Sequence, residues 1–122
     1  MNGKDYIFIK HDKKISKVYY NNITYIESNA DYCTIYTTIS RLTYSIHISL
    51  DGFINYLPKH SFCQCHRRFI VNVDNVSSIM DDAISVGEHT VLIGEFYKKD
   101  FFNMINCLPT TSQLKKEIKN GK

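Results

Sequence analysis

Short apolar runs alternate with polar turns along most of this chain, at a spacing of about ten residues. The runs are rich in β-branched and aromatic residues, which favour strands, while Asn, Asp, Ser and Gly separate them, as in turns. The pattern predicts strands over residues 6–10, 16–20, 24–28, 32–38, 42–48, 62–66, 69–73, 76–80, 84–86 and 90–93. Such spacing is typical of antiparallel sheets, so the chain is predicted to be mainly β.

Two segments change to helical spacing. The first predicted helix covers residues 50–57, where apolar residues follow the potential N-cap Ser49 and precede the helix-breaking Pro58. The second predicted helix covers residues 97–108. The polar segment 112–119 is compatible with a further short helix that could fray.

Length and composition indicate one globular domain. The chain has 122 residues, of which 43% are hydrophobic, so it can bury a modest core. No segment is apolar and long enough to span a membrane, and the first residues lack an apolar signal region. We therefore expect a cytoplasmic protein.

The charge is mildly basic and unevenly distributed. The formal net charge is +3, and five of the lysines fall within residues 1–19. Further basic pairs stand at residues 67–68 and 98–99, and acidic residues at 81, 82 and 88 offset them. A one-sided positive surface is compatible with this distribution, but the net charge alone does not indicate a nucleic-acid partner.

The cysteines admit two interpretations. Cys63 and Cys65 lie two residues apart in a predicted strand, so they share one face. Buried free thiols are the usual outcome in a reducing cytoplasm. A zinc site would need four ligands, and only His66 stands beside the two cysteines. We therefore expect core cysteines, with no metal and no other cofactor.

Catalytic signatures are missing from the sequence. It contains no G-x-S-x-G and no P-loop. The adjacent Asp81 and Asp82 would point to opposite faces of an extended chain, which makes a solvated turn a better interpretation than a catalytic pair. The five histidines show no i, i+4 pairing. The sequence therefore does not predict an enzyme.

Two adjacent arginines, Arg67 and Arg68, stand at the corner between two predicted strands. An unpaired buried charge is too costly, so at least one of them must face solvent or an anion. An arginine can make two hydrogen bonds to guanine O6 and N7, or it can bind a phosphate. The alternative is a surface salt bridge with Asp81, Asp82 or Glu95.

The corner belongs to a longer pattern, F-x-x-x-H-R-x-F-I-V-N, over residues 62–72. This pattern resembles the signature of LytTR-type DNA-binding domains, the output modules of many bacterial response regulators. Residues 23–36 resemble the family's I-x-Y-I-E block with its following D-Y-x-x-I, and residues 91–102 resemble its closing strand and last helix. The resemblance implies a domain over residues 4–108, followed by a polar C-terminal tail over 109–122.

The resemblance also implies how DNA would be bound. The implied fold is an elongated sandwich of small antiparallel sheets with two short helices, in which loops rather than a recognition helix enter the groove. Three loops would supply the contacts: residues 28–32, the corner at 66–68, and residues 94–96 leading into the last helix. The implied DNA-binding residues are Asn29, Asp31, Tyr32, His66, Arg67, Arg68, Glu95, Lys98 and Lys99.

The sequence departs from the family pattern at three of its positions. The third loop of the family commonly reads S-R-x-Y, with the arginine aimed at DNA, and here Glu95 replaces that arginine. Glutamate is repelled by phosphates, although it can accept a hydrogen bond from cytosine N4. Gln64 stands where arginine is frequent, and Arg68 stands where a small hydroxyl residue is usual.

Two functional hypotheses follow. The leading hypothesis is a sequence-specific transcriptional regulator that binds double-stranded DNA through its loops, as a homodimer on paired repeats. It would be a stand-alone regulator or the output half of a longer two-component protein with a receiver domain, because no receiver is present within these residues. The alternative, supported by Glu95, is a protein-interaction module on the same fold with weakened DNA binding.

Overall fold

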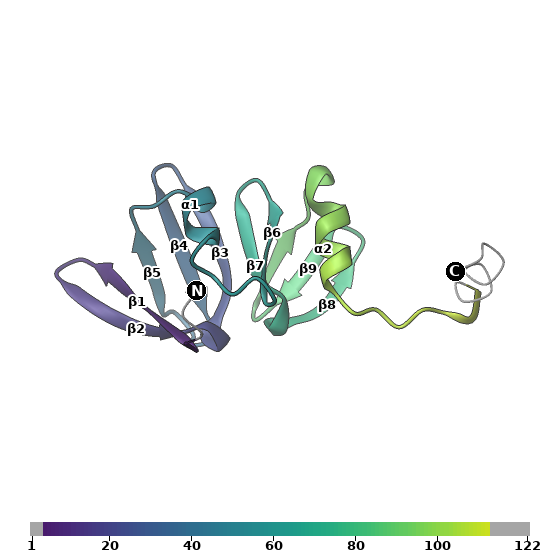
Figure 1. Cartoon of the computed structure of the whole chain (residues 1–122), viewed down its shortest axis with the longest axis horizontal. Coiled ribbons are helices and arrows are strands. Elements are labelled where there is room, and N and C mark those ends of the chain that lie inside the picture. The colour runs from purple at the N-terminus through teal and green to yellow at the C-terminus, as the bar shows by residue number, and fades with distance from the viewer. Residues whose placement is uncertain (1–3, 113–122) are drawn as a thin grey trace.

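The computed structural model describes residues 4–112. Strands dominate this part of the chain, and two short α-helices accompany them (Figure 1). The helices are α1 (Leu50–Ile54) and α2 (Lys98–Met104). The strands are β1 (Tyr6–His11), β2 (Lys14–Tyr19), β3 (Ile23–Asn29), β4 (Tyr32–Thr37), β5 (Thr43–Ile46), β6 (Phe62–His66), β7 (Phe69–Asn72), β8 (Val76–Met80), β9 (Ala83–Val86) and β10 (His89–Leu92).

The strands form three small antiparallel sheets. The largest has the order β5-β4-β3-β7-β6, the second has the order β10-β9-β8, and β1 and β2 form a separate two-stranded ribbon. Figure 1 shows the sheets side by side along an elongated molecule, with the ribbon at one end and α2 at the other. The predicted mainly β fold, an elongated sandwich of small antiparallel sheets with two short helices, is confirmed.

The large sheet separates two hydrophobic cores. Successive residues of its central strands alternate between the cores, so Ile26 and Ile70 pack into the first while Tyr25 and Val71 pack into the second. This alternation follows from the two-residue period of a strand. The ribbon and α1 supply further members of the first core, and the second sheet and α2 supply further members of the second.

Both helices are shorter than their sequence patterns predict. Ser49 caps α1 as expected, because its Oγ accepts a hydrogen bond from Gly52 N at 3.1 Å. The chain then tightens after Ile54, where Leu57 N donates to the Ile54 carbonyl, three residues back. A 3₁₀ turn over Glu95–Tyr97 precedes α2, and extended backbone at Ile105 ends it. The helix considered for residues 112–119 lies almost wholly outside the described residues.

Asn72, at the end of β7, joins the large sheet to the turn before β3. Its buried Nδ2 donates to the carbonyls of Tyr20 and Ile23 at 3.1 and 2.9 Å, and its Oδ1 accepts from Asp74 N at 3.1 Å. A buried amide with its partners satisfied fixes one arrangement of the chain. This residue therefore holds the strand that leads away from the Arg67–Arg68 corner.

Within residues 4–112, no helix is long and apolar enough to cross a membrane.

Candidate nucleic-acid interface

The turn between β6 and β7 carries the two arginines. A register shift between Gln64 and His66 interrupts the pairing of these strands immediately before the turn. His66 Nδ1 accepts a hydrogen bond from Arg68 N at 3.1 Å, and Gln64 Nε2 donates to the His66 carbonyl at 3.2 Å. The bond to Nδ1 leaves the Nε2 atom of a neutral His66 as the protonated, donating nitrogen. Side chains of the corner thus fix its backbone.

Arg68 connects this corner to the first loop, at the end of β3. Its Nη2 lies 3.4 Å from Glu27 Oε2, and its Nε and Nη2 donate to the Ser28 carbonyl at 3.4 and 3.3 Å. Nη2 also reaches Asn29 Oδ1 at 3.5 Å. In the backbone, Ser28 N donates to the Arg68 carbonyl at 2.9 Å. The first loop and the corner therefore form one hydrogen-bonded unit.

The two arginines differ in their surroundings. The Arg67 side chain is exposed and makes no hydrogen bond or ion pair within the described residues. Arg68 pairs with Glu27, and among the described residues neither arginine contacts Asp81, Asp82 or Glu95, so the alternative of a salt bridge to one of these three residues is wrong. The sequence could not indicate Glu27, because the contact depends on the pairing of β3 with β7. Arg67 keeps its full set of donors for a ligand.

The first loop is a tight reversal between β3 and β4. Ala30 takes a positive φ of 53°, and Asn29 Nδ2 donates to Thr34 Oγ1 at 3.1 Å across the turn. Asp31 and Tyr32 are exposed, and the Tyr32 ring lies 5.1 Å from the His47 ring. The loop therefore offers one carboxylate and one aromatic ring to solvent, and its Asn29 Oδ1 lies 3.5 Å from the Arg68 Nη2.

The third loop contacts the corner from its other side. Gly94 N donates to the Cys65 carbonyl at 2.8 Å. A side chain at position 94 would lie 3.5 Å from His66 Cδ2 and 3.2 Å from Tyr97 Cδ2, so glycine permits this close approach. The three loops are consequently contiguous, and Figure 1 shows the β3–β4 turn, the β6–β7 turn and the start of α2 along one long edge of the molecule.

Lys98, at the start of α2, lies between two carboxylates. Its Nζ lies 2.9 Å from Glu95 Oε1 and 3.0 Å from Asp82 Oδ1. Hydrogen bonds to Glu95 and Asp82 raise the pKa of the Lys98 ammonium group. Glu95 and Asp82 therefore offset the charge of Lys98, and the exposed Lys99 has no such partner within the described residues. The third loop contributes little net positive charge.

Phe96 projects from the third loop and was not among the residues expected to bind DNA. Phe96 is 97% exposed, the highest value among the exposed large hydrophobic residues of the described chain. The 3₁₀ turn over Glu95–Tyr97 directs it outward, and Tyr97 packs against Gly94. No residue pattern marks this 3₁₀ turn, so the sequence could not show that Phe96 points outward. An outward ring at this edge can stack on a base or contact a thymine methyl group.

The cysteines beside the corner are core residues, as expected. Cys65 is fully buried and Cys63 partly buried, and both pack in the second core. Burial raises the pKa of the Cys65 thiol to about 12, with a smaller contribution from Cys63, and burial also raises the pKa of Cys63. Within residues 4–112, no group of three potential metal ligands comes together.

Comparison with known proteins adds family evidence to this geometry. The family model of the LytTr DNA-binding domain matches residues 13–106. A solved LytTr DNA-binding domain, from a protein described as a methyl-accepting/DNA response regulator of Bacillus cereus, is similar to this chain with a TM-score of 0.73. The two are 27% identical, and the match covers 86% of this chain and 100% of that one. No curated protein matches this chain significantly.

Proposed function

Because this chain belongs to the LytTR family of DNA-binding domains, we propose that it is a sequence-specific transcriptional regulator whose three contiguous loops bind duplex DNA. The single observation that carries this proposal is the exposed Arg67 at the centre of the loop edge, whose side chain has no partner among residues 4–112. An arginine without a protein partner in a fixed turn is ready to bind an anion or a base.

Arg67 and Phe96 are the proposed base-reading side chains. The Arg67 fork suits the O6 and N7 acceptors of guanine in the major groove. Phe96 suits a thymine methyl group, or a base face where the duplex is deformed. Both side chains extend from turns whose backbones are held by hydrogen bonds, so little backbone ordering opposes their contacts.

Arg68 and its neighbours have a positioning role in this proposal. The Arg68 fork holds the first loop through Glu27, Ser28 and Asn29, and its Nη1 donors have no partner among residues 4–112. These free donors suit a phosphate, and Lys99 and the Nε2–H of His66 suit others. Asn29, Asp31 and Tyr32 would contact the DNA from the first loop. Arg68 would set the position of this loop relative to the corner.

Glu95 and Lys98 limit the electrostatic attraction of the third loop. Glu95 would face either the phosphates, which repel it, or cytosine N4, which can donate to it. Because Lys98 is paired with Glu95 and Asp82, its charge is not free to release a counterion from DNA. Affinity would then depend mainly on the corner. This arrangement also favours the second candidate function, a protein-interaction module with weakened DNA binding.

The proposed cellular setting is a bacterial two-component system in the cytoplasm. The chain would bind paired repeats as a homodimer, alone or as the output domain of a longer protein with a receiver domain. Residues 4–108 would form the DNA-binding unit, and residues 109–122 a polar tail. The solved Bacillus cereus relative, described as part of a response regulator, supports this setting.

Selection of binding sites from random duplex DNA tests the proposed function. A regulator should enrich a defined motif, arranged as two repeats if a homodimer binds. Binding to the enriched duplex should weaken steeply as salt rises, because phosphate contacts release counterions. Failure to enrich any motif, combined with salt-insensitive capture of a protein partner, would favour the interaction module.

A further inference from the structure

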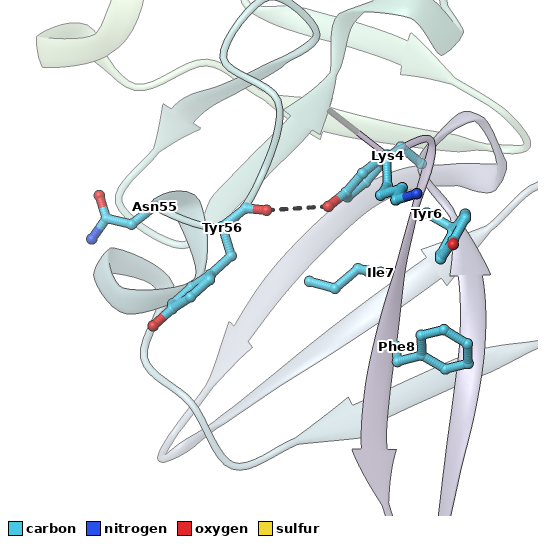
Figure 2. Close-up of a pocket in the computed structure, with 7 residues that line it drawn as sticks. Lys4, Tyr6, Ile7, Phe8, Asn55 and Tyr56 are labelled. Atoms are coloured by element: carbon cyan, nitrogen blue, oxygen red, sulfur yellow. Dashed lines mark hydrogen bonds between the residues drawn. The ribbon is translucent and has the colours of Figure 1, made fainter. Parts of the chain in front are cut away.

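The β1–β2 ribbon exposes an aromatic face that the DNA-binding loops do not use. Residues 6–9 of β1 are apolar without interruption, a pattern found in strands that are covered on both sides. One side is covered, because Ile9 is buried and Ile7 packs against the first core. Figure 2 shows Ile7 directed toward Tyr56, whereas Tyr6 and Phe8 project from the opposite side of β1.

The register of the ribbon defines the members of this outer face. Tyr6 pairs with Tyr19, Phe8 with Lys17, and Lys10 with Ile15, so their side chains form two rows on one side. We call the six residues Tyr6, Phe8, Lys10, Ile15, Lys17 and Tyr19 the ribbon face. Phe8, Ile15 and Tyr19 are 55%, 64% and 47% exposed. An apolar cluster of this kind is the usual mark of an interaction site.

Lys17 lies at the centre of the ribbon face. Its Nζ is 4.5 Å from the Tyr6 ring centroid, 5.6 Å from that of Tyr19 and 5.7 Å from that of Phe8. The three rings hold the ammonium group in place through cation–π attraction. Neither Lys17 nor Lys10 makes a salt bridge within the described residues. The ribbon face therefore presents a positioned, unneutralised positive charge surrounded by apolar groups.

Charge identifies the class of partner. Residues 4–19 hold five lysines and two aspartates, which leaves ten basic and ten acidic residues in the remainder of the chain. The whole formal excess of +3 thus resides in the ribbon segment. A second copy is disfavoured, because a two-fold interface would place the lysines of the face against each other, and the face contains no carboxylate.

Duplex DNA and membranes fit the ribbon face less well. Duplex DNA presents phosphates but few apolar groups that could cover Phe8, Ile15 and Tyr19. The ribbon also lies at one end of the molecule, whereas the three loops follow its long edge (Figure 1). A bilayer would cover the apolar groups, but an inserted patch would carry the Lys17 charge into hydrocarbon at its centre, which is costly.

We propose that the ribbon face binds an acidic protein surface, in which a carboxylate pairs with Lys17 and apolar side chains cover Phe8, Ile15 and Tyr19. In such a contact, apolar side chains surround a central charge pair and exclude water from it. Charges in this arrangement contribute strongly to the specificity of an interface. This proposal is independent of the DNA-binding function, because the two surfaces share no residue.

A phage-displayed library of random dodecapeptides provides the probe. The whole chain, immobilised at low salt, should enrich peptides that combine Asp or Glu with Phe, Leu or Ile. A synthetic peptide of the enriched sequence should bind the Lys17→Glu and Phe8→Ala variants about tenfold more weakly than the wild type. The matched variants Lys13→Glu, in the ribbon turn, and Leu92→Ala, in β10 and 53% exposed, should bind within about twofold of wild type.

The folding of the variants, the peptides enriched and the binding to peptide, duplex DNA and vesicles decide the outcome. Circular dichroism and Tm of the four variants establish that each is folded, as expected because Phe8 and Lys17 are both exposed. Failure to enrich any peptide, enrichment of basic peptides, or equal weakening by the control variants would overturn the proposal. It would also be overturned if Lys17→Glu and Phe8→Ala weakened binding to duplex DNA or to phosphatidylserine vesicles more than binding to the peptide.

Discussion

Arg68 and Glu27 are 41 residues apart in the sequence, yet the Arg68 Nη2 lies 3.4 Å from the Glu27 Oε2. The antiparallel pairing of β3 with β7 brings them together. The contact joins the corner that carries Arg67 to the first loop, so two of the three candidate DNA-binding loops move as one unit. Arg68, which the family resemblance places among the DNA-binding residues, therefore also positions protein loops.

A double-mutant cycle tests the positioning role of this pair. The pair is partly exposed, so Glu27→Gln and Arg68→Ala should each lower the free energy of unfolding by at most about 1 kcal/mol. Both should weaken specific DNA binding, and their effects should be non-additive, because either change removes the same ion pair between the corner and the first loop. Binding measured by fluorescence anisotropy gives the coupling. Fully additive losses would show that Arg68 acts on DNA without Glu27.

Phe96 should contribute to DNA binding although it contributes little to the fold. Its side chain is 97% exposed, so Phe96→Ala should leave Tm nearly unchanged. If the ring contacts a base, the same change should cost about 1–3 kcal/mol of DNA-binding free energy. Leu108, also exposed but beyond α2, supplies the matched control Leu108→Ala. Equal DNA affinity of Phe96→Ala and Leu108→Ala would exclude Phe96 from the interface.

Glu95 should weaken DNA binding through its charge. Glu95→Gln removes one repelled charge and one partner of Lys98, and Glu95→Arg adds a cation as well. General affinity for duplex DNA should therefore rise in the order wild type, Glu95→Gln, Glu95→Arg. The slope of log affinity against log salt should steepen by about one unit for Glu95→Arg. Lower affinity of Glu95→Gln for a selected site alone would instead indicate that Glu95 reads cytosine.

The cysteines should differ in reactivity with thiol reagents. The thiolate is the reactive form, and burial raises the pKa of Cys65 to about 12, so its thiolate stays scarce from pH 7 to 10. Cys33 is also buried with a raised pKa, whereas Cys107 is exposed. Native protein should label rapidly at Cys107, and Cys33 and Cys65 only after unfolding. Mass spectrometry of labelled peptides gives the result, and rapid native labelling of Cys65 would contradict its burial.

The metal content of the purified chain tests whether Cys63 and Cys65 are core residues. The purified chain should contain no zinc, and a Cys63→Val, Cys65→Val variant should have the same metal content. These positions are apolar sites of the second core, where valine suits the strand. Stoichiometric zinc in the wild type, lost in the double variant, would restore the metal-site interpretation.

Much of the fold could be predicted from the sequence because its signals are local. Short runs of β-branched and aromatic residues between polar turns located the strands, and Ser49 marked the start of α1. The helix ends were less accurate, because apolar residues such as Leu57 keep helical spacing after the backbone has left the helix. Leu57 is fully buried from a turn instead.

The relationships within the site could not be predicted in the same way. The Arg68–Glu27 pair and the Gly94–Cys65 hydrogen bond join residues that only the sheet topology brings together. The neutralisation of Lys98 by Asp82 likewise depends on the turn between β8 and β9. The exposure of Phe96 depends on a 3₁₀ turn that no residue pattern marked. The family pattern in the sequence indicated which loops are candidates for DNA binding. The structure adds the hydrogen bonds and ion pairs that position these loops.

The affinity of Arg67→Ala for a selected duplex tests the central claim most directly. Arg41→Ala is the matched control, because Arg41 is also exposed and stands in the β4–β5 turn, at the opposite end of β4 from the first loop. Fluorescence anisotropy over a range of salt concentrations measures both variants on the selected duplex and on a scrambled one. We expect Arg67→Ala to lose about 1–3 kcal/mol on the selected duplex and to discriminate less between the two, with Arg41→Ala close to wild type. Wild-type affinity of Arg67→Ala on every duplex would contradict the assignment of this corner as the DNA-reading surface.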